Sequence, residues 1–382
     1  MIINRILEKP LSKAIKHYSV LFITGPRQSG KTTISKKLFS EYIYKNLEDP
    51  ETRLLAHNDP KNFLSQTNKI IIDEIQRVPE LLSYIQVMTD ADNKKKFVIT
   101  GSQNILVSQK ISQSLAGRVA IFNLLPFSFE EIINTNFEKK DIYEQVIYGF
   151  YPRVYDRSLN PIEWYPNYIQ TYLERDVREI KNISSLTDFQ RFLKLCAGRT
   201  GQILNLSSLA NDLGTAVNTI KGWLSILEAT YIIYLVPPFY KNFNKRIIKS
   251  PKLYFYDTGL ACSLLSIKNE DQLKTHPLYG NIFETFCVSE AVKQNYNNNL
   301  NISFYYWRDK SGNEVDLLYE KDNKINAIEI KSSSTFSQEF IKELNYLERI
   351  TKDTINKKVI YSSQKDTHYK DVLLQGWRNI KI

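Results

Sequence analysis

Three short apolar runs near the start of the chain each end in small or charged residues. They cover residues 20–24, 69–74 and 97–102. Their continuous hydrophobic character is typical of strands that are buried on both faces of a parallel sheet. A helical pattern over 34–39 follows the first run. The pattern predicts an α/β domain whose polar residues lie at the carboxyl ends of its strands.

The first run leads into a loop bounded by Gly25 and Gly30, with the spacing of a Walker A motif. Such a loop turns its backbone N–H groups inward around phosphates, and the next helix points its positive N-terminal end at them. Lys31 is expected to reach the β- and γ-phosphates of ATP, and the Thr32 hydroxyl to complete the Mg²⁺ shell. The candidate ATP-binding residues of this segment are Gly25, Pro26, Arg27, Gln28, Ser29, Gly30, Lys31, Thr32 and Thr33.

The second run ends in Asp73 and Glu74, which is a Walker B pattern. Asp73 is expected to hold Mg²⁺ through water, and Glu74 to polarise the attacking water as a catalytic residue. An apolar run ending in Asp-Glu is common by itself, but its place downstream of a Walker A loop makes it specific. The third run ends at Ser102 and Gln103, either of which could sense the γ-phosphate.

Arg118 stands between a predicted helix and a predicted strand. There it could reach the γ-phosphate of a neighbouring subunit as a catalytic arginine finger. A structural surface arginine is the alternative interpretation. A finger that acts between subunits would imply a homo-oligomer.

The middle of the chain has the rhythm of a helix, a turn and a second helix over 206–235, with Gly214 at the turn. This resembles a winged helix. Exposed residues of the second helix would include Asn218, Thr219 and Lys221. A basic hairpin would follow, with Lys241, Lys245, Arg246 and Lys249. DNA binding is one interpretation; a packing module or a lid element of the ATPase is the other.

A hairpin is predicted near the C-terminus, with strands over 313–318 and 325–331 and a charged turn at 321–324. Glu329 and Lys331 are two residues apart, so both face the side opposite Ile328 and Ile330. Asp316 on the partner strand can join them. This arrangement resembles the PD-(D/E)xK nucleases.

Phosphodiester hydrolysis would use these residues in distinct roles. Asp316 and Glu329 could bind Mg²⁺, and Lys331 could orient or deprotonate the attacking water. Glu284, in the predicted helix 281–292, is a further candidate metal ligand. A structural salt bridge between Lys331 and Asp316 would account for the charges equally well.

The order of the segments GPRQSGKT, IIIDEIQ, VITGSQ, LAGRV and LPFSFEE resembles a prokaryotic group of AAA+-type ATPases. In that group the C-terminal part carries a domain of unassigned function. Segments 148–152, 168–176, 256–260 and 280–284 extend the resemblance over nearly the whole chain. The resemblance implies a nucleotide-hydrolysing core with appended domains.

The length of 382 residues exceeds one compact core and favours two or three domains. We expect three. Residues 1–148 would form an AAA+-like P-loop NTPase domain with a parallel sheet. Residues 149–250 would form a helical region with the winged helix. Residues 251–382 would form an α/β domain like that of restriction endonucleases.

The composition of the chain narrows the partners, metal sites and cellular location that we expect. The formal net charge of +10 suits a polyanion such as DNA, although biased codon usage could also produce it. Cys196, Cys262 and Cys287 are widely spaced, so neither a zinc site nor a disulfide framework is indicated. No stretch approaches the ~18 apolar residues of a membrane helix. These features predict a cytoplasmic protein without a membrane partner.

The sequence thus predicts an ATPase with ATP and Mg²⁺ as cofactors. The leading hypothesis couples ATP hydrolysis to the binding or cleavage of DNA. The alternative is a nucleotide-controlled switch whose nuclease-like domain is an inactive binding module.

Overall fold

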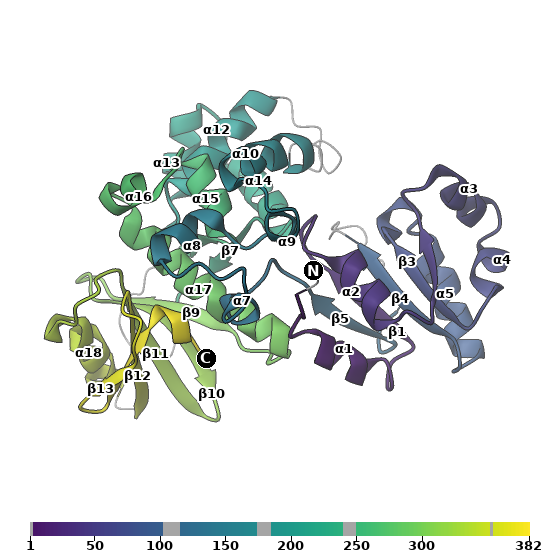
Figure 1. Cartoon of the computed structure of the whole chain (residues 1–382). Coiled ribbons are helices and arrows are strands. Elements are labelled where there is room, and N and C mark those ends of the chain that lie inside the picture. Colours follow the sequence, from purple (N-terminus) through teal and green to yellow (C-terminus); the bar gives the residue numbers. More distant parts are fainter. Residues whose placement is uncertain (1–2, 102–114, 174–184, 240–249, 352–353) are drawn as a thin grey trace. The chain divides into compact units, whose positions relative to one another are not determined.

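The computed structural model describes residues 3–101, 115–173, 185–239, 250–351 and 354–382. Two units divide the chain. The N-terminal unit comprises Met1–Phe127 with the short segments Ala229–Tyr231 and Tyr296–Asn299. The C-terminal unit comprises Ser128–Glu228, Ile232–Asn295 and Leu300–Ile382, so the predicted middle and C-terminal domains share one unit (Figure 1). The boundaries expected at 148 and 250 stay predictions.

A parallel five-stranded sheet, in the order β2-β3-β4-β1-β5, forms the centre of the N-terminal unit. The predicted apolar runs become β1, β3 and β4, which confirms that they are parallel strands. The strands are β1 (Val20–Thr24), β2 (Ile43–Asn46), β3 (Lys69–Asp73), β4 (Lys96–Gly101) and β5 (Val119–Asn123). The helices are α1 (Glu8–Ala14), α2 (Lys31–Leu38), α3 (Pro50–Asn58), α4 (Pro60–Ser65), η1 (Ile75–Arg77) and α5 (Leu81–Ala91).

Alternate residues of each strand enter two different hydrophobic cores, because successive side chains point to opposite faces of a sheet. Val20 and Phe22 of β1 pack with α3, α4 and α5 on one face. Leu21 and Ile23 pack with α1 and α2 on the other face. Both faces are therefore covered by helices (Figure 1), which explains why all five residues of β1 are buried.

The first part of the C-terminal unit is mainly helical and carries a small antiparallel sheet in the order β6-β8-β7. Its strands are β6 (Gln202–Ile203), β7 (Ile233–Val236) and β8 (Lys252–Phe255). Its helices are α7 (Phe129–Ile132), α8 (Ile142–Tyr148), α9 (Pro152–Asp156), α10 (Pro161–Tyr168), the π-helix η2 (Ile169–Leu173), α12 (Leu186–Ala197), α13 (Leu206–Leu213), α14 (Val217–Ala229), α15 (Thr258–Leu264) and α16 (Glu270–Thr275).

The predicted helix–turn–helix is confirmed as α13 and α14, with Gly214 in the left-handed conformation between them (φ 63°). Of the predicted exposed residues on α14, Asn218 and Lys221 are exposed and Thr219 is half-buried. The expected basic residues Lys241, Lys245, Arg246 and Lys249 lie outside the described residues.

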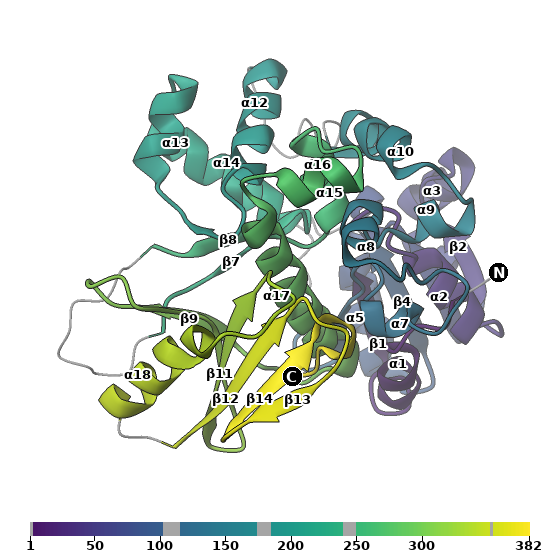
Figure 2. The ribbon, with the colours of Figure 1, turned by 60° about the vertical axis from the view of Figure 1, so that its left-hand side comes forward.

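A mixed six-stranded sheet in the order β13-β14-β12-β11-β10-β9 follows (Figure 2). The predicted hairpin is confirmed, since β10 and β11 are antiparallel and pair Lys321 with Lys324 across a two-residue turn. Leu344 and Leu347 of α18 pack on one face of this sheet. The elements are α17 (Tyr279–Asn298), β9 (Phe304–Arg308), β10 (Glu314–Lys321), β11 (Lys324–Lys331), η3 (Gln338–Ile341), α18 (Lys342–Thr351), β12 (Ile355–Tyr361), β13 (Thr367–Tyr369), β14 (Val372–Gly376) and η4 (Trp377–Asn379).

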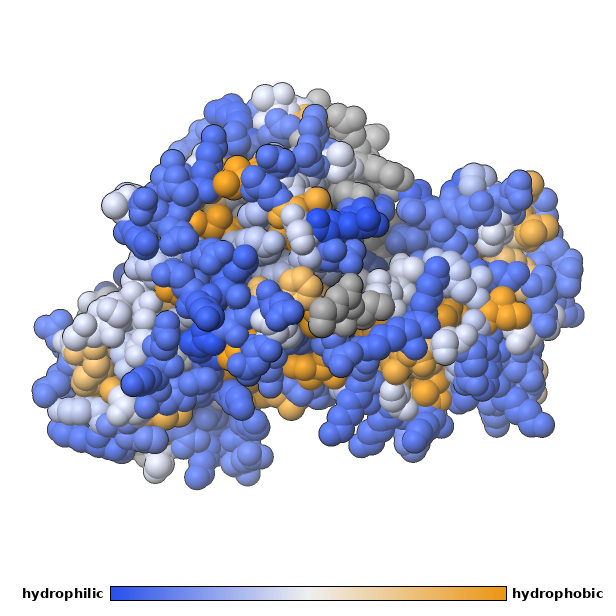
Figure 3. Space-filling model, viewed as in Figure 1, coloured by the Kyte–Doolittle hydropathy of each residue, from blue (hydrophilic) through white to orange (hydrophobic). Residues whose placement is uncertain are grey.

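Hydrophilic side chains cover most of the surface seen in Figure 3, with apolar side chains in small groups between them. Within the described part of the chain, none of the helices has the length and apolar character needed to cross a membrane.

Candidate nucleotide site and C-terminal carboxylate cluster

The loop between β1 and α2 has backbone conformations that favour glycine. Gly25 has φ 149° and Gly30 has φ 98°. A Cβ atom on Gly25 would lie 2.1 Å from the carbonyl oxygen of Leu124, which is closer than any side chain tolerates. Gln28 also has a left-handed φ of 61°. The loop is therefore built to keep its backbone close to the segment after β5.

Two buried cations fix this loop. The Lys31 ammonium donates to the carbonyl oxygens of Gly25 (3.0 Å) and Pro26 (2.8 Å). The Arg5 guanidinium donates to the carbonyl oxygens of Ser29 (2.9 Å) and Leu125 (2.7 Å). Arg5 thereby ties the loop to the end of β5, and both side chains are buried.

Asp73 lies at the carboxyl end of β3 and accepts three hydroxyl hydrogen bonds. Thr32 (2.8 Å) and Tyr44 (2.6 Å) donate to its Oδ2 atom. Thr100 of the neighbouring strand β4 donates to Oδ1. The Walker A threonine and the Walker B aspartate are thus in direct contact, at the edge of the sheet where parallel strands end.

Glu74 follows in a left-handed conformation with φ 60°. Its carboxylate accepts a hydrogen bond from the Gln76 side chain. Burial raises the pKa of Glu74, while the nearby charges of Lys31 and Arg27 oppose this shift. Glu74 is thus a half-buried carboxylate with two cations near it.

Two polar side-chain atoms of the loop could accept a hydrogen bond from a ligand or donate one to it. The Ser29 hydroxyl and the Gln28 side-chain oxygen are buried and have no hydrogen-bond partner among the described residues. Buried polar atoms are costly unless they are paired. Together with the glycine-dependent backbone, they fit a phosphate-binding loop. Ser102, the remaining candidate from this sheet, and Gln103 lie outside the described residues.

Arg118 lies at the amino-terminal ends of the parallel strands, whereas the loop that contains Lys31 lies at their carboxyl ends. Arg118 directly precedes β5, and its carbonyl oxygen accepts from the N–H of Val20, where β1 begins. The exposed guanidinium forms an ion pair with Asp90 (2.5 Å). This ion pair raises the pKa of Arg118. Arg118 therefore lies away from the Walker A loop of its own chain, and its role as a finger stays a prediction.

The predicted C-terminal residues come together on neighbouring elements. Asp316 of β10 and Glu329 of β11 lie one residue beyond the paired positions Leu317 and Ile328. Glu329 pairs with Lys331, and one oxygen of Asp316 accepts from the backbone N–H of Ile330 (2.8 Å). The expected salt bridge between Lys331 and Asp316 is not among the described ion pairs.

Lys252, the first residue of β8, lies at the centre of this cluster. Its ammonium nitrogen is 2.8 Å from Glu284 Oε1, 2.5 Å from Glu314 Oε1 and 3.4 Å from Asp316 Oδ1. The Lys252 side chain is only 2% exposed. Tyr254, also of β8, donates to the same Glu284 oxygen (2.6 Å). We call Lys252, Tyr254, Glu284, Glu314, Asp316, Glu329 and Lys331 the C-terminal carboxylate cluster.

Burial dominates the electrostatics of this cluster. It raises the pKa of Glu284 to about 7, although the Lys252 charge opposes the shift. Burial and the neighbouring Asp316 raise the pKa of Glu329 well above the ordinary value. One Glu329 oxygen has no hydrogen-bond partner among the described residues. No group of three or more His, Cys, Asp or Glu side chains in the described ranges could hold a metal ion.

Several of these residues could not be found from motifs. The folded chain brings four residues to these sites from distant positions in the sequence: Arg5, Tyr44, Thr100 and Lys252. The one available signal was the position of Lys252 at the start of an otherwise apolar strand, where a buried charge requires a partner.

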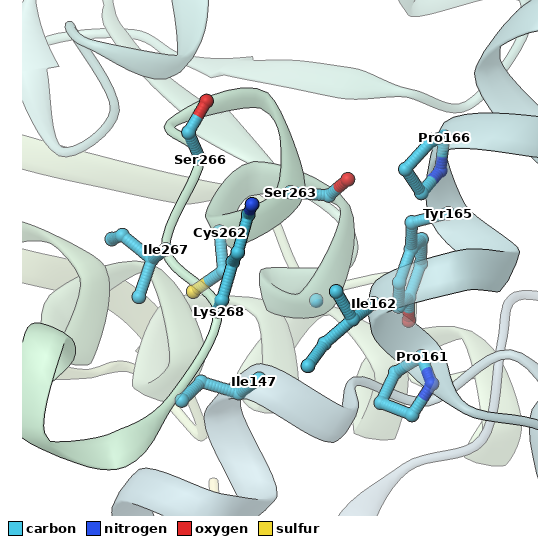
Figure 4. Close-up of a pocket in the computed structure, with 11 residues that line it drawn as sticks. Ile147, Pro161, Ile162, Tyr165, Pro166, Cys262, Ser263, Ser266, Ile267 and Lys268 are labelled. Carbon is cyan, nitrogen blue, oxygen red and sulfur yellow. The ribbon is translucent and has the colours of Figure 1, made fainter.

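A separate cavity of about 160 Å³ lies in the C-terminal unit, between residues of α8, α10 and α15 (Figure 4). Tyr165 and Cys262 line it, and Lys268 lies at its wall. The Tyr165 hydroxyl donates to Asp257 (2.7 Å), and burial raises the pKa of the Cys262 thiol. These groups serve the packing of the unit, and we assign the cavity no function.

Three family models match successive parts of the chain. Residues 17–133 match the model of an AAA domain. Residues 139–271 match a domain of unknown function (DUF8612), and residues 279–379 match another (DUF4143). The N-terminal part is therefore an AAA-type P-loop ATPase domain.

An uncharacterized protein of Mycobacterium tuberculosis is 31% identical over 332 residues, which cover 85% of this chain and 73% of that protein. The chain belongs to the same family. An uncharacterized protein of Methanocaldococcus jannaschii is 27% identical over 357 residues. The alignment covers 85% of this chain and 76% of that protein. The similarity of these relatives therefore extends beyond the AAA domain into the C-terminal unit.

A Walker-type ATPase of Pyrococcus abyssi is similar in structure over 69% of this chain and 96% of its own, with 15% sequence identity and a TM-score of 0.47. This likeness is too low to support an argument about function.

Proposed function

We propose that the protein is a Mg²⁺-dependent ATPase whose N-terminal unit binds ATP at residues 25–33. The observation that carries this proposal is the direct contact between Thr32 and Asp73, 2.8 Å, beside the buried Lys31. Mg²⁺ in such sites keeps most of its ligands from phosphates and water, so one hydroxyl and one carboxylate suffice on the protein. The loop residues supply the phosphate contacts.

The side chains would take separate roles. Lys31 would leave the carbonyl oxygens of Gly25 and Pro26 and bind the β- and γ-phosphates. Tyr44 and Thr100 would keep the Asp73 carboxylate oriented. Glu74 would orient the attacking water after it leaves Gln76. Mg²⁺, held by Thr32 and by Asp73 through water, would neutralise charge on the phosphates.

The test is ATP binding and steady-state hydrolysis of the full chain. We expect Lys31→Ala to lose ATP binding. Glu74→Gln should bind ATP and lose activity by about 10² or more, the usual contribution of a positioned base. Lys13→Ala removes an exposed lysine of α1 and serves as the control with unchanged activity. Hydrolysis by Lys31→Ala at the parental rate would contradict the proposal.

We propose further that the C-terminal unit binds DNA and that the nucleotide state of the AAA domain controls this binding. The support is α14, whose N-terminal half exposes Asn218 and Lys221 while Ile220, Trp223 and Leu224 are buried. Residues at the start of the second helix contact base edges in helix–turn–helix proteins. The net charge of +10 has the sign that a polyanion requires.

Salt dependence of DNA affinity tests this proposal. We expect Lys221→Ala to weaken binding of short duplexes and to reduce the slope of log K against log[salt] by about 1, because one phosphate contact is lost. Lys194→Ala removes the same charge from α12 and is the matched control. Equal effects of both variants would show that charge alone, and not α14, determines binding.

A further inference from the structure

Lys252 occupies the place that a divalent metal ion would need in the C-terminal carboxylate cluster. Carboxylates from two different elements, α17 and β10, converge on its ammonium nitrogen within 3.4 Å. Mg²⁺ or Ca²⁺ requires oxygen ligands at about 2.0–2.6 Å around one point. A metal ion at that point and the Lys252 ammonium cannot coexist.

Two of these carboxylates also use their second oxygen atom, and the third shares one oxygen between two donors. Asp316 Oδ2 accepts from the backbone N–H of Ile330 (2.8 Å). Glu314 Oε2 pairs with Arg308 (2.9 Å). Glu284 Oε1 accepts from Tyr254 as well as from Lys252. The carboxylates around Lys252 therefore form an ion-pair network rather than an open metal shell. The Glu329 oxygen that has no partner among the described residues belongs to a carboxylate outside these Lys252 contacts.

Lys252 is held in this position from both sides of its strand. β8 is the central strand of its sheet and pairs with both β6 and β7. Withdrawal of the side chain would leave buried carboxylates without their cation, which is strongly destabilising in proteins. The ammonium therefore joins the small β6-β8-β7 sheet to α17 and to the mixed sheet.

We infer that Lys252 is the resident cation of the C-terminal carboxylate cluster and replaces a divalent metal ion there. The cluster then binds no Mg²⁺ and does not cleave phosphodiesters by metal-ion catalysis. Its role is to connect the small antiparallel sheet to α17 and to the mixed sheet. The metal-ligand roles predicted for Glu284 and Asp316 are thereby reassigned to an internal ion-pair network, and Glu329 pairs with Lys331 instead. This inference does not depend on the ATPase activity of the AAA domain.

Titration of the nucleotide-free full chain with Mn²⁺, followed by the electron paramagnetic resonance of free Mn²⁺, tests the inference. All variants carry Asp73→Asn, so that the nucleotide site contributes no metal binding and its function does not affect the result. We expect the titrations of this parent and of its Asp316→Asn variant to superpose. Mn²⁺ binding by the parent that Asp316→Asn abolishes would overturn the inference.

The Lys252→Met variant is the second part of this test. Removal of the ammonium should create one Mn²⁺ site per chain, and the added Asp316→Asn change should remove it. The matched control is Lys357→Met, because Lys357 is also a buried lysine, paired with Glu348 (2.8 Å) and Asp371 (2.6 Å) in the same unit. The control should bind no additional Mn²⁺. If Lys252→Met fails to fold, the comparison of the parent with Asp316→Asn still shows whether the cluster binds Mn²⁺.

Discussion

Glu74 shows how single residues of the nucleotide site are adjusted by their surroundings. Its left-handed backbone conformation, φ 60°, is costly for a residue other than glycine, by about 1–3 kcal/mol, and such strain is common at functional sites. Burial raises its pKa, and the charges of Lys31 and Arg27 lower it. The protonation of this carboxylate therefore depends on its cationic neighbours.

The pH profile of ATP hydrolysis follows from this balance. A base must be ionised to act, so activity falls as the pH decreases through its pKa. Arg27→Gln removes a charge that favours the ionised form of Glu74. We therefore expect the acid limb of kcat to move to higher pH in Arg27→Gln, as measured from pH 5 to 9. A limb that stays in place, or moves down, would show that Glu74 is not the titrating group.

Asp73 gives a second prediction at this scale. Tyr44→Phe removes one of the hydroxyl groups that orient its carboxylate. We expect a several-fold rise in the Mg²⁺ concentration needed for half-maximal ATPase activity, on the order of the 10-fold effect of lost outer-shell contacts in metal sites. Tyr18→Phe, at an exposed tyrosine outside the site, is the control. An unchanged Mg²⁺ requirement in Tyr44→Phe would assign Tyr44 to packing alone.

Residues of the site that are close in sequence could be predicted, and residues assembled by the fold could not. The Walker spacing located Lys31, Thr32, Asp73 and Glu74, because the loop and the strand end carry their own chemistry. Arg5 fixes the loop by hydrogen bonds from a distant part of the chain, and Tyr44 reaches Asp73 because β2 pairs with β3. Lys252 belongs to a sheet other than that of Asp316, and the pattern of the hairpin gave no indication of it.

Among the elements, the loop before α2 is the most constrained. Gly25 combines a left-handed φ with a position that brings a Cβ atom to 2.1 Å from the Leu124 carbonyl oxygen. Periodicity predicted the strands, the helix–turn–helix and the hairpin, because each has a local apolar pattern. The order of the strands in the sheet follows from chain crossings, which a local pattern does not contain.

Gly25→Ala tests the constraint on the loop. We expect a loss of at least about 1–3 kcal/mol in the stability of the N-terminal unit from backbone strain alone, and loss of ATP binding. Gly117→Ala is the control, since Gly117 has φ 76° but no atom within 4 Å of the added Cβ. It should show the cost of the conformation without the steric clash. Thermal unfolding with and without ATP measures the stability and the ATP binding of each variant. Equal losses in Gly25→Ala and Gly117→Ala would show that the contact with Leu124 is unimportant.

For the whole molecule, the role of Arg118 bears on assembly. An arginine finger would act on the ATP of a neighbouring chain, so ATPase activity per chain should rise with protein concentration. We expect Arg118→Ala to remove this rise. Asp90→Asn breaks the ion pair with Arg118 but keeps the guanidinium, and it should retain the rise. Equal losses in both variants would assign Arg118 to the surface ion pair.

The proposed coupling between the AAA domain and DNA is tested most directly by the affinity of the full chain for DNA in different nucleotide states. Fluorescence anisotropy of a labelled duplex would be measured with ATP, with ADP and without nucleotide, at one fixed salt concentration. We expect the DNA Kd to differ at least about fivefold between nucleotide states, the lower end of usual coupling between two sites. Lys31→Ala should bind DNA with one Kd in all three conditions. Equal affinity of the unmodified protein in every nucleotide state would contradict the proposal that the AAA domain controls DNA binding.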